Sequence, residues 1–251
     1  MLSLAACASQ SRPGATSDAA DPLEGWNRGV YAVNKGLDNV LMKPVAKAYR
    51  AAVPQPIRDR VHNGLENLDL PLVFANQILQ GEWKYSGQTM FRFLVNSTLG
   101  LAGIHDIASA AGMPKSQGGD FGQTLAVWGV QSGPYLMLPL FGPSTVRDAV
   151  GLGVDTVADP WPPVIRAAND RYIWLTYVRF GAEAVDGRER ALDQLDAIER
   201  TSVDEYATLR SLYLQHREAE IQRTDQKPGG TGSPFEGSDF DAPAGSTAPS
   251  Q

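Results

Sequence analysis

The residues best suited to chemistry in this chain of 251 residues are a serine between glycines and three scattered histidines. The segment from Gly129 to Gly133, GVQSG, is close to the nucleophile elbow G-x-S-x-G of hydrolases, but its serine stands one position out of register. A serine flanked by glycine more often marks a turn. A lipid-cleaving enzyme with Ser132 as its nucleophile is therefore a weak alternative.

Metal and cofactor sites also lack their usual motifs in this sequence. His62, His105 and His216 are far apart and form no H-E-x-x-H pair, and a single cysteine cannot complete a metal site with them. Neither G-x-x-x-x-G-K-[ST] nor G-x-G-x-x-G occurs. The sequence therefore predicts no metal, no cofactor and no enzymatic activity.

The composition is that of a folded chain, with 43% hydrophobic and 20% charged residues. A formal net charge of -6 offers no general attraction to nucleic acid, so we expect no nucleic-acid partner. The richest apolar run, Tyr135 to Gly142, is interrupted by Pro139 and is far shorter than the roughly 18 residues of a membrane-spanning helix. The sequence therefore predicts no spanning helix.

The elements that must position any site are helical. Apolar residues at three- and four-residue spacing predict an amphipathic helix over 23–41 that ends before Pro44. Further helices are expected over 57–68, over a separate apolar segment 70–79, and over 83–99. No segment alternates as a strand does.

The second half continues this pattern. Helices are expected over 121–128, over 144–158 with Ser144 as the N-cap, and from 163 to 179. Two charged segments, 187–200 and 203–222, have the spacing of surface helices. The predicted fold class is all-α.

One apolar segment does not fit a helix. GVQSGPYLMLPLFGP places apolar residues between glycines and prolines, which disfavours both a long helix and a regular strand. It is either an extended segment in the core or a hairpin beside a lipid-handling cavity, with its glycines and prolines as hinges. Gly25 and Gly29, spaced G-x-x-x-G in the first helix, are expected to mark a close contact between helices.

Several segments together resemble the MlaA (VacJ) family of outer-membrane lipoproteins. They are DPLEGWNRGVYAVN, VPQPIRDRVHNGLENL, NQILQG, FRFLVNSTLGLAGIHDIA and DFGQTLAVWGVQSGPYLMLPLFGPSTVRD, in the same order as in the family between Asp21 and Pro160. The resemblance implies an all-α, ring-like protein in the inner leaflet of the outer membrane, with a central amphipathic channel. It also implies retrograde transport of phospholipids, trimeric porins as membrane partners, and a periplasmic lipid carrier, MlaC. The alternative is an adaptor lipoprotein without transport activity.

The resemblance further implies roles for particular residues. The part of the first helix that helps to control the channel corresponds to Tyr31, Ala32, Val33 and Asn34. The surface facing the porin corresponds to 53–88, and the gating hairpin to 129–147. The hairpin residues are Gly133, Pro134, Tyr135, Leu136, Leu138, Pro139, Phe141 and Gly142.

The N-terminal segment fits the same interpretation. Leu4-Ala5-Ala6-Cys7 has the form of a lipobox, after which Cys7 would become the lipidated N-terminus. Two or more acyl chains provide stable anchoring where one is marginal. Because six residues are too few for a signal peptide, 1–7 is expected to be a signal remnant with a start codon upstream of Met1. We expect a flexible tether over 8–20, the helical domain over 21–223 and a disordered tail over 224–251.

Overall fold

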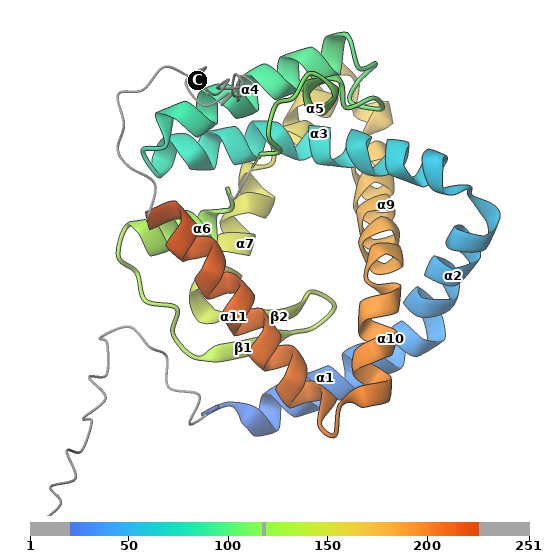
Figure 1. Cartoon of the computed structure of the whole chain (residues 1–251), viewed down its shortest axis with the longest axis vertical. Coiled ribbons are helices and arrows are strands. Elements are labelled where there is room, and N and C mark those ends of the chain that lie inside the picture. Colours follow the sequence, from blue (N-terminus) through green and yellow to red (C-terminus); the bar gives the residue numbers. More distant parts are fainter. Residues whose placement is uncertain (1–20, 117–118, 226–251) are drawn as a thin grey trace, which may run out of the picture.

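The computed structural model describes residues 21–116 and 119–225. It confirms the all-α class, with one small hairpin (Figure 1). The elements are α1 (Glu24–Leu37), η1 (Asp38–Met42, π-helical), α2 (Lys43–Ala52), α3 (Gln55–Leu79), α4 (Trp83–Thr98), α5 (Ile107–Ala110), α6 (Phe121–Val127), β1 (Tyr135–Leu138), β2 (Gly142–Thr145), α7 (Val146–Ala158), α8 (Trp161–Ala168), η2 (Asp170–Tyr172), α9 (Trp174–Arg190), α10 (Leu192–Thr201) and α11 (Glu205–Asp225). Cys7, the predicted tether and the tail from 226 onward lie outside the described residues, whereas 224 and 225 belong to α11.

The helices follow one another around the perimeter of the molecule (Figure 1). In that view α3 and α4 lie along the top, α2, α9 and α10 along the right, α1 at the bottom and α11 along the left. Helices α3 and α4 pack on each other, and α2 packs on α9. The hairpin of β1 and β2 lies inside this perimeter, where it contacts α1, α7 and α11.

The sequence predicted that the first helix ends before Pro44, and this prediction is wrong. Helix α1 continues through η1 into α2, and the Lys43 N–H donates to the carbonyl of Asp38, one residue further back than in an α-helix. Pro44 directly follows this turn, at the start of α2, and supplies no N–H to the turn before it. The chain thus stays helical through the proline, with the π-helical turn immediately before it.

The predicted break near residue 69 is also absent, because α3 is one helix with Pro71 inside it. An internal proline removes one backbone hydrogen bond and disturbs the preceding turn. The carbonyl of Leu68, in that turn, accepts a hydrogen bond from the Trp161 indole at 2.7 Å. Packing against α4 and this contact from α8 hold the helix together across the proline.

The apolar segment is a hairpin, but its arms are regular strands, contrary to the prediction. Strand β1 pairs antiparallel with β2, from Tyr135 opposite Thr145 to Leu138 opposite Gly142. The connecting loop has three residues, 139–141, and Leu140 at its centre lies in the left-handed region, at φ 68°.

The hairpin leads into α7 at a close crossing with α6. A Cβ at Gly151 of α7 would lie 2.3 Å from the backbone nitrogen of Gly122 in α6. Thr145, not the predicted Ser144, caps α7 by accepting a hydrogen bond from the Asp148 N–H. The predicted close contact at Gly25 and Gly29 is wrong, because a Cβ at either position would meet nothing within 4 Å.

Candidate functional site

A cavity of about 490 Å³ lies between α1, the hairpin and the three helices α9, α10 and α11. Its apolar lining includes Leu37, Met42, Met137, Leu140, Phe141, Pro143, Leu195, Ile198 and Leu209. Its charged lining is Lys35, Asp38, Lys43, Glu183, Arg188, Asp196, Glu199 and Glu205. The cavity therefore offers both an apolar and a charged surface to one ligand.

Two asparagines of α1 hold the hairpin against this cavity. The side-chain amide of Asn27 donates to the Tyr135 carbonyl at 3.1 Å, and its oxygen accepts from the Met137 N–H at 2.8 Å. Asn34 repeats this pairing near the tip of the hairpin, with the Leu138 carbonyl and the Leu140 N–H, each at 2.9 Å. The two residues are seven apart and so share one face of α1. We call these four hydrogen bonds the amide clamp.

The two halves of the amide clamp differ in burial. Asn27 is 0% exposed, whereas Asn34 is partly exposed and the Leu140 N–H that it binds lies at the surface. Beyond Leu140, the ring of Phe141 lies 6.3 Å from the ring of Phe180 in α9. The tip of the hairpin therefore extends from α1 to α9, across one side of the cavity.

The predicted site residues separate into two groups. Tyr31, Asn34, Phe141 and Gly142 line the cavity. Ala32 and Val33 are exposed and outside the lining. The remaining hairpin residues of the prediction also lie outside it, namely Gly133, Pro134, Tyr135, Leu136, Leu138 and Pro139. Tyr135 is buried, and its carbonyl belongs to the amide clamp.

The sequence prediction missed the charged residues of the cavity and Asn27. Lys35 pairs with Glu205, Lys43 pairs with Asp196, and Arg188 pairs with Asp38 at 2.6 Å. These residues come from segments far apart in the chain, so each looks like an ordinary surface charge in the sequence. The seven-residue spacing of Asn27 and Asn34 was a visible signal, because polar residues on the inner face of an amphipathic helix need a partner.

The ion pairs of the cavity shift the pKa values of their members so that the charged forms are favoured. Hydrogen bonds from Lys35 and Tyr31 lower the pKa of Glu205. A hydrogen bond from Lys43 lowers the pKa of Asp196, and the pKa of Lys43 is raised in return. All three side chains are thus charged near neutral pH.

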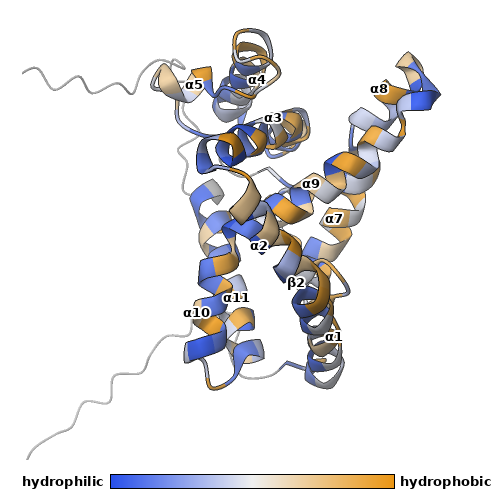
Figure 2. Ribbon diagram, turned by 90° about the vertical axis from the view of Figure 1, so that its right-hand side faces the viewer, coloured by the Kyte–Doolittle hydropathy of each residue, from blue (hydrophilic) through white to orange (hydrophobic). Residues whose placement is uncertain are grey.

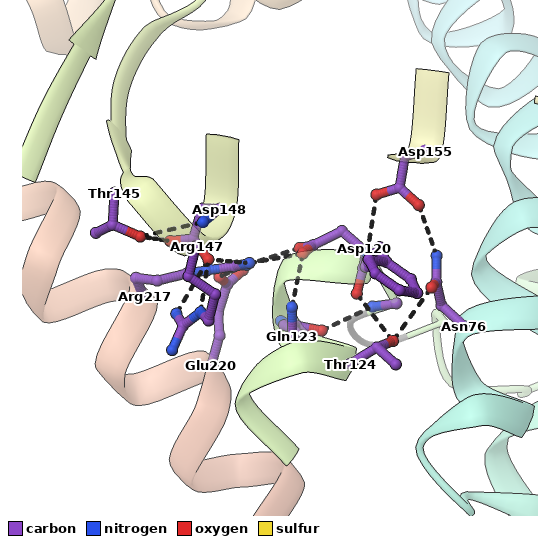
Figure 3. A network of polar contacts seen from close by, with 12 residues as sticks. Asn76, Asp120, Gln123, Thr124, Thr145, Arg147, Asp148, Asp155, Arg217 and Glu220 are labelled. Atoms are coloured by element: carbon purple, nitrogen blue, oxygen red, sulfur yellow. Dashed lines mark hydrogen bonds and ion pairs between the residues drawn. The ribbon is translucent and has the colours of Figure 1, made fainter. Parts of the chain in front are cut away.

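A buried polar network fixes the other end of the hairpin (Figure 3). Arg217 of α11 donates to both oxygens of Asp120 at 2.7 and 2.6 Å, and to Asp148 at 3.0 Å. Thr145, the last residue of β2, donates to Asp148 at 2.9 Å. Burial opposes ionisation of Asp148, but the charge and hydrogen bonds of Arg217 outweigh it and lower the pKa of this carboxyl. The base of the hairpin is therefore held on α6, α7 and α11.

The same network reaches α3 through Asp155, whose two oxygens accept from the Asn76 amide and the Phe121 N–H, each at 2.9 Å (Figure 3). Thr124 donates to the Asn76 oxygen at 3.1 Å. Burial raises the pKa of Asp155. The hairpin is thus held by a buried network at its base and, at its tip, by Asn34 and the contact of Phe141 with Phe180.

Three observations concern the candidate nucleophile, metal sites and membrane-spanning helices. Ser132 contributes its backbone carbonyl to the Arg147 N–H, at 3.1 Å. Across residues 21–116 and 119–225, no group of three or more histidine, cysteine, aspartate or glutamate side chains could hold a metal ion. In the same ranges, no helix has the length and apolar character needed to cross a membrane.

Polarity is inverted relative to a water-soluble domain. Buried residues in the described part of the chain include many polar and charged side chains, such as Asn27, Gln77, Gln123 and Arg217. Large apolar side chains are strongly exposed instead, among them Trp26, Val40, Trp83, Leu99, Leu140, Val157 and Tyr177. Figure 2 shows hydrophobic residues along α7, α8 and α9. Exposed apolar surface of this extent marks contact with a membrane or a partner.

Comparison with known proteins agrees with this description. A family model described as MlaA lipoprotein matches residues 19–220. The chain is 38% identical over 218 residues to the intermembrane phospholipid transport system lipoprotein MlaA of Escherichia coli (strain K12), covering 83% of this chain and 81% of that protein. It is 31% identical over 232 residues to the protein of the same name from Haemophilus influenzae, covering 88% and 86%.

A solved structure has the same fold. It comes from a study described as "Structural basis for maintenance of bacterial outer membrane lipid asymmetry", with a TM-score of 0.68 and 32% identity over 80% of this chain and 99% of that one. These relatives define the class of protein as helical bacterial lipoproteins. The chain belongs to the MlaA lipoprotein family, which confirms the resemblance found in the sequence.

Proposed function

We propose that this chain is an outer-membrane lipoprotein that removes mislocalised phospholipids from the outer leaflet and so maintains lipid asymmetry. The observation that carries the proposal is the amphipathic cavity beside a hairpin that is fixed at its base and lightly held at its tip. Relatives named for intermembrane phospholipid transport support the same function. No covalent step is needed, because the lipid leaves unchanged.

Physical chemistry explains why such a conduit is needed. A phospholipid with two acyl chains exposes about 30 methylene groups, each worth about 0.8 kcal/mol on transfer to water. Unassisted passage would therefore cost roughly 25 kcal/mol. A path lined by both apolar and charged side chains removes most of this cost for chains and headgroup alike.

The exposed apolar side chains support a position in the membrane. They fit a protein embedded in the inner leaflet without spanning the bilayer, anchored in addition through acyl chains on Cys7. In this position a trimeric porin would contact the surface formed by 53–88, and a periplasmic carrier, MlaC, would receive the lipid. Tyr31, Ala32, Val33 and Asn34 would help to control passage, with the hairpin from Gly133 to Gly142 as the gate.

Replacement of Phe141 by aspartate tests the conduit directly. Phe141 lines the cavity but is 56% exposed, so the substitution alters the path with little effect on folding. Leu212→Asp is the matched control, because Leu212 is 49% exposed and lies outside the lining. Each variant is returned to cells that lack the gene, and phospholipid on the cell surface is measured through acylation of lipid A by an outer-leaflet enzyme.

We expect deletion to raise surface phospholipid, and wild type and Leu212→Asp to restore it. Phe141→Asp should restore it incompletely, because a charge at the tip of the hairpin opposes passage of acyl chains. Unchanged lipid asymmetry after deletion would contradict transport and favour the adaptor role instead. Full restoration by Phe141→Asp would show that lipids do not pass this cavity.

A further inference from the structure

The charged residues of the cavity form a wall with an excess of carboxylates. Three cations (Lys35, Lys43 and Arg188) face five carboxylates (Asp38, Glu183, Asp196, Glu199 and Glu205), which gives the lining a formal net charge of -2. We call these eight residues the charged wall. Such a wall repels a ligand with a net negative charge, unless the ligand can reach a free cation.

Each cation of the charged wall already has a carboxylate partner. Lys43 lies 2.8 Å from Asp196 and 2.8 Å from Glu199. Lys35 binds Glu205, and Arg188 holds both oxygens of Asp38 at 2.6 and 2.8 Å. A lipid phosphate therefore gains a cation only by displacing a carboxylate.

Glu199 is the carboxylate best placed for displacement. One oxygen lies 2.8 Å from Lys43 and the other 3.8 Å from Lys35, so the side chain bridges the two lysines. It is 41% exposed, and the 3.8 Å separation is too long for a hydrogen bond. A phosphodiester, which also presents two anionic oxygens, matches the bridging position between Lys35 and Lys43.

The displaced carboxylate decides which headgroup is accepted. With a phosphate between the lysines, Glu199 loses its partners and needs another cation. A headgroup that carries an ammonium group supplies that cation on the same molecule, whereas an anionic headgroup leaves the carboxylate unpaired beside the phosphate. Leu195 and Ile198 of α10 line the cavity close to Glu199 in the sequence and offer apolar surface to the acyl chains.

We propose that the charged wall selects phospholipids with a zwitterionic, ammonium-bearing headgroup over phospholipids with a net negative headgroup, through the exchange of Glu199 for the lipid phosphate. The proposal rests on the proposed transport function and names the class of lipid for the same cavity. Glu199 is a specificity-determining residue in this account.

The test is a competition between two lipids for the full-length protein. Purified protein is incubated with vesicles of equal parts phosphatidylethanolamine and phosphatidylglycerol, reisolated, and the ratio of bound lipids measured by mass spectrometry. Glu199→Gln removes one negative charge of the charged wall. Glu24→Gln is the matched control, because Glu24 is also a half-exposed carboxylate in an ion pair but lies outside the cavity.

Wild type and Glu24→Gln should both enrich phosphatidylethanolamine, and Glu199→Gln should reduce the enrichment by about two- to ten-fold. The enrichment by wild type should also fall as ionic strength rises, a measurement that needs no variant. Binding of both lipids without preference, or a preference that Glu199→Gln leaves intact, would overturn the selection but not the transport function. A protein that binds neither lipid would contradict the transport function and, with it, the selection.

Discussion

Replacement of Gly151 by alanine would add a methyl group that overlaps the backbone of α6. The new Cβ would lie 2.3 Å from the nitrogen and 2.6 Å from the Cα of Gly122, whereas ordinary contacts begin at 3.4 Å. The two helices would have to separate by about 1 Å to relieve this overlap. Backbone atoms cannot rotate aside as a side chain can, so the strain falls on the whole crossing.

The expected magnitude is the difference between two opposing effects. Overpacking costs about 1–3 kcal/mol. The higher end of this range applies because separation of α6 and α7 also lengthens the hydrogen bonds of Arg217 in α11 to Asp120 and Asp148, which are 2.6 and 3.0 Å long. Alanine gains about 1 kcal/mol over glycine in a helix interior. We expect Gly151→Ala to lower the free energy of unfolding by about 1–2 kcal/mol.

Gly153 of the same helix supplies the control, because a Cβ there would meet nothing within 4 Å. Gly153→Ala should raise the free energy of unfolding by up to about 1 kcal/mol. Both variants are unfolded by urea in detergent, with helix content followed by circular dichroism. If Gly151→Ala proved as stable as Gly153→Ala, the close crossing of α6 and α7 would be refuted.

Two further predictions concern the amide clamp and acid stability. Asn27→Ala should leave two buried backbone groups of β1 without partners and lower the free energy of unfolding by about 2–4 kcal/mol. Asn34→Ala should lower it by about 1 kcal/mol or less, and its main effect should be faster amide exchange at Leu140. Hydrogen-exchange mass spectrometry of the hairpin distinguishes the two variants. Equal exchange rates in both would contradict the difference in burial between Asn27 and Asn34. Burial raises the pKa of the Asp106 carboxyl, but hydrogen bonds from Ser109 and Asn96 outweigh it and lower the pKa to about 2. Because this pKa lies below its unfolded value, the stabilisation is present above about pH 4 and is lost as the pH falls toward 2, a change of about 2 kcal/mol. Asp106→Asn should flatten the pH dependence of unfolding over that range, and a variant that kept the wild-type slope would disprove it.

The helices were predictable from the sequence because their apolar spacing is local. Pro44 misled the prediction at one place, since a single residue was given more weight than the helix around it. Near residue 69 the error came from the change to an almost wholly apolar pattern, which suggested a separate helix where the chain in fact continues through Pro71. Whether a helix continues through a proline depends on a π-helical turn or on the indole of Trp161, and neither can be read from nearby residues. Only the contact from Trp161 is tertiary, whereas the π-helical turn is a local feature of the backbone.

The site was predictable only where it coincided with a local pattern. The apolar hairpin stood out by composition, and the resemblance to the family pointed to the middle of the first helix. The pairing of Lys43 with Glu199 joins residues more than 150 positions apart, and no spacing rule brings them together. Ala32 and Val33 were named with Tyr31 and Asn34 as one segment, although neighbours on a helix face different directions.

The amide clamp also protects the hairpin from other chains. A strand at the edge of a sheet presents unpaired N–H and C=O groups, which invite another extended segment to pair and so promote aggregation. On β1 the edge away from β2 is occupied by the side chains of Asn27 and Asn34, which bind backbone groups from Tyr135 to Leu140. The helix thus serves as a substitute for a third strand. If the hairpin acts as the proposed gate and lifts only at Asn34, Asn27 keeps the rest of this edge covered against β-sheet growth.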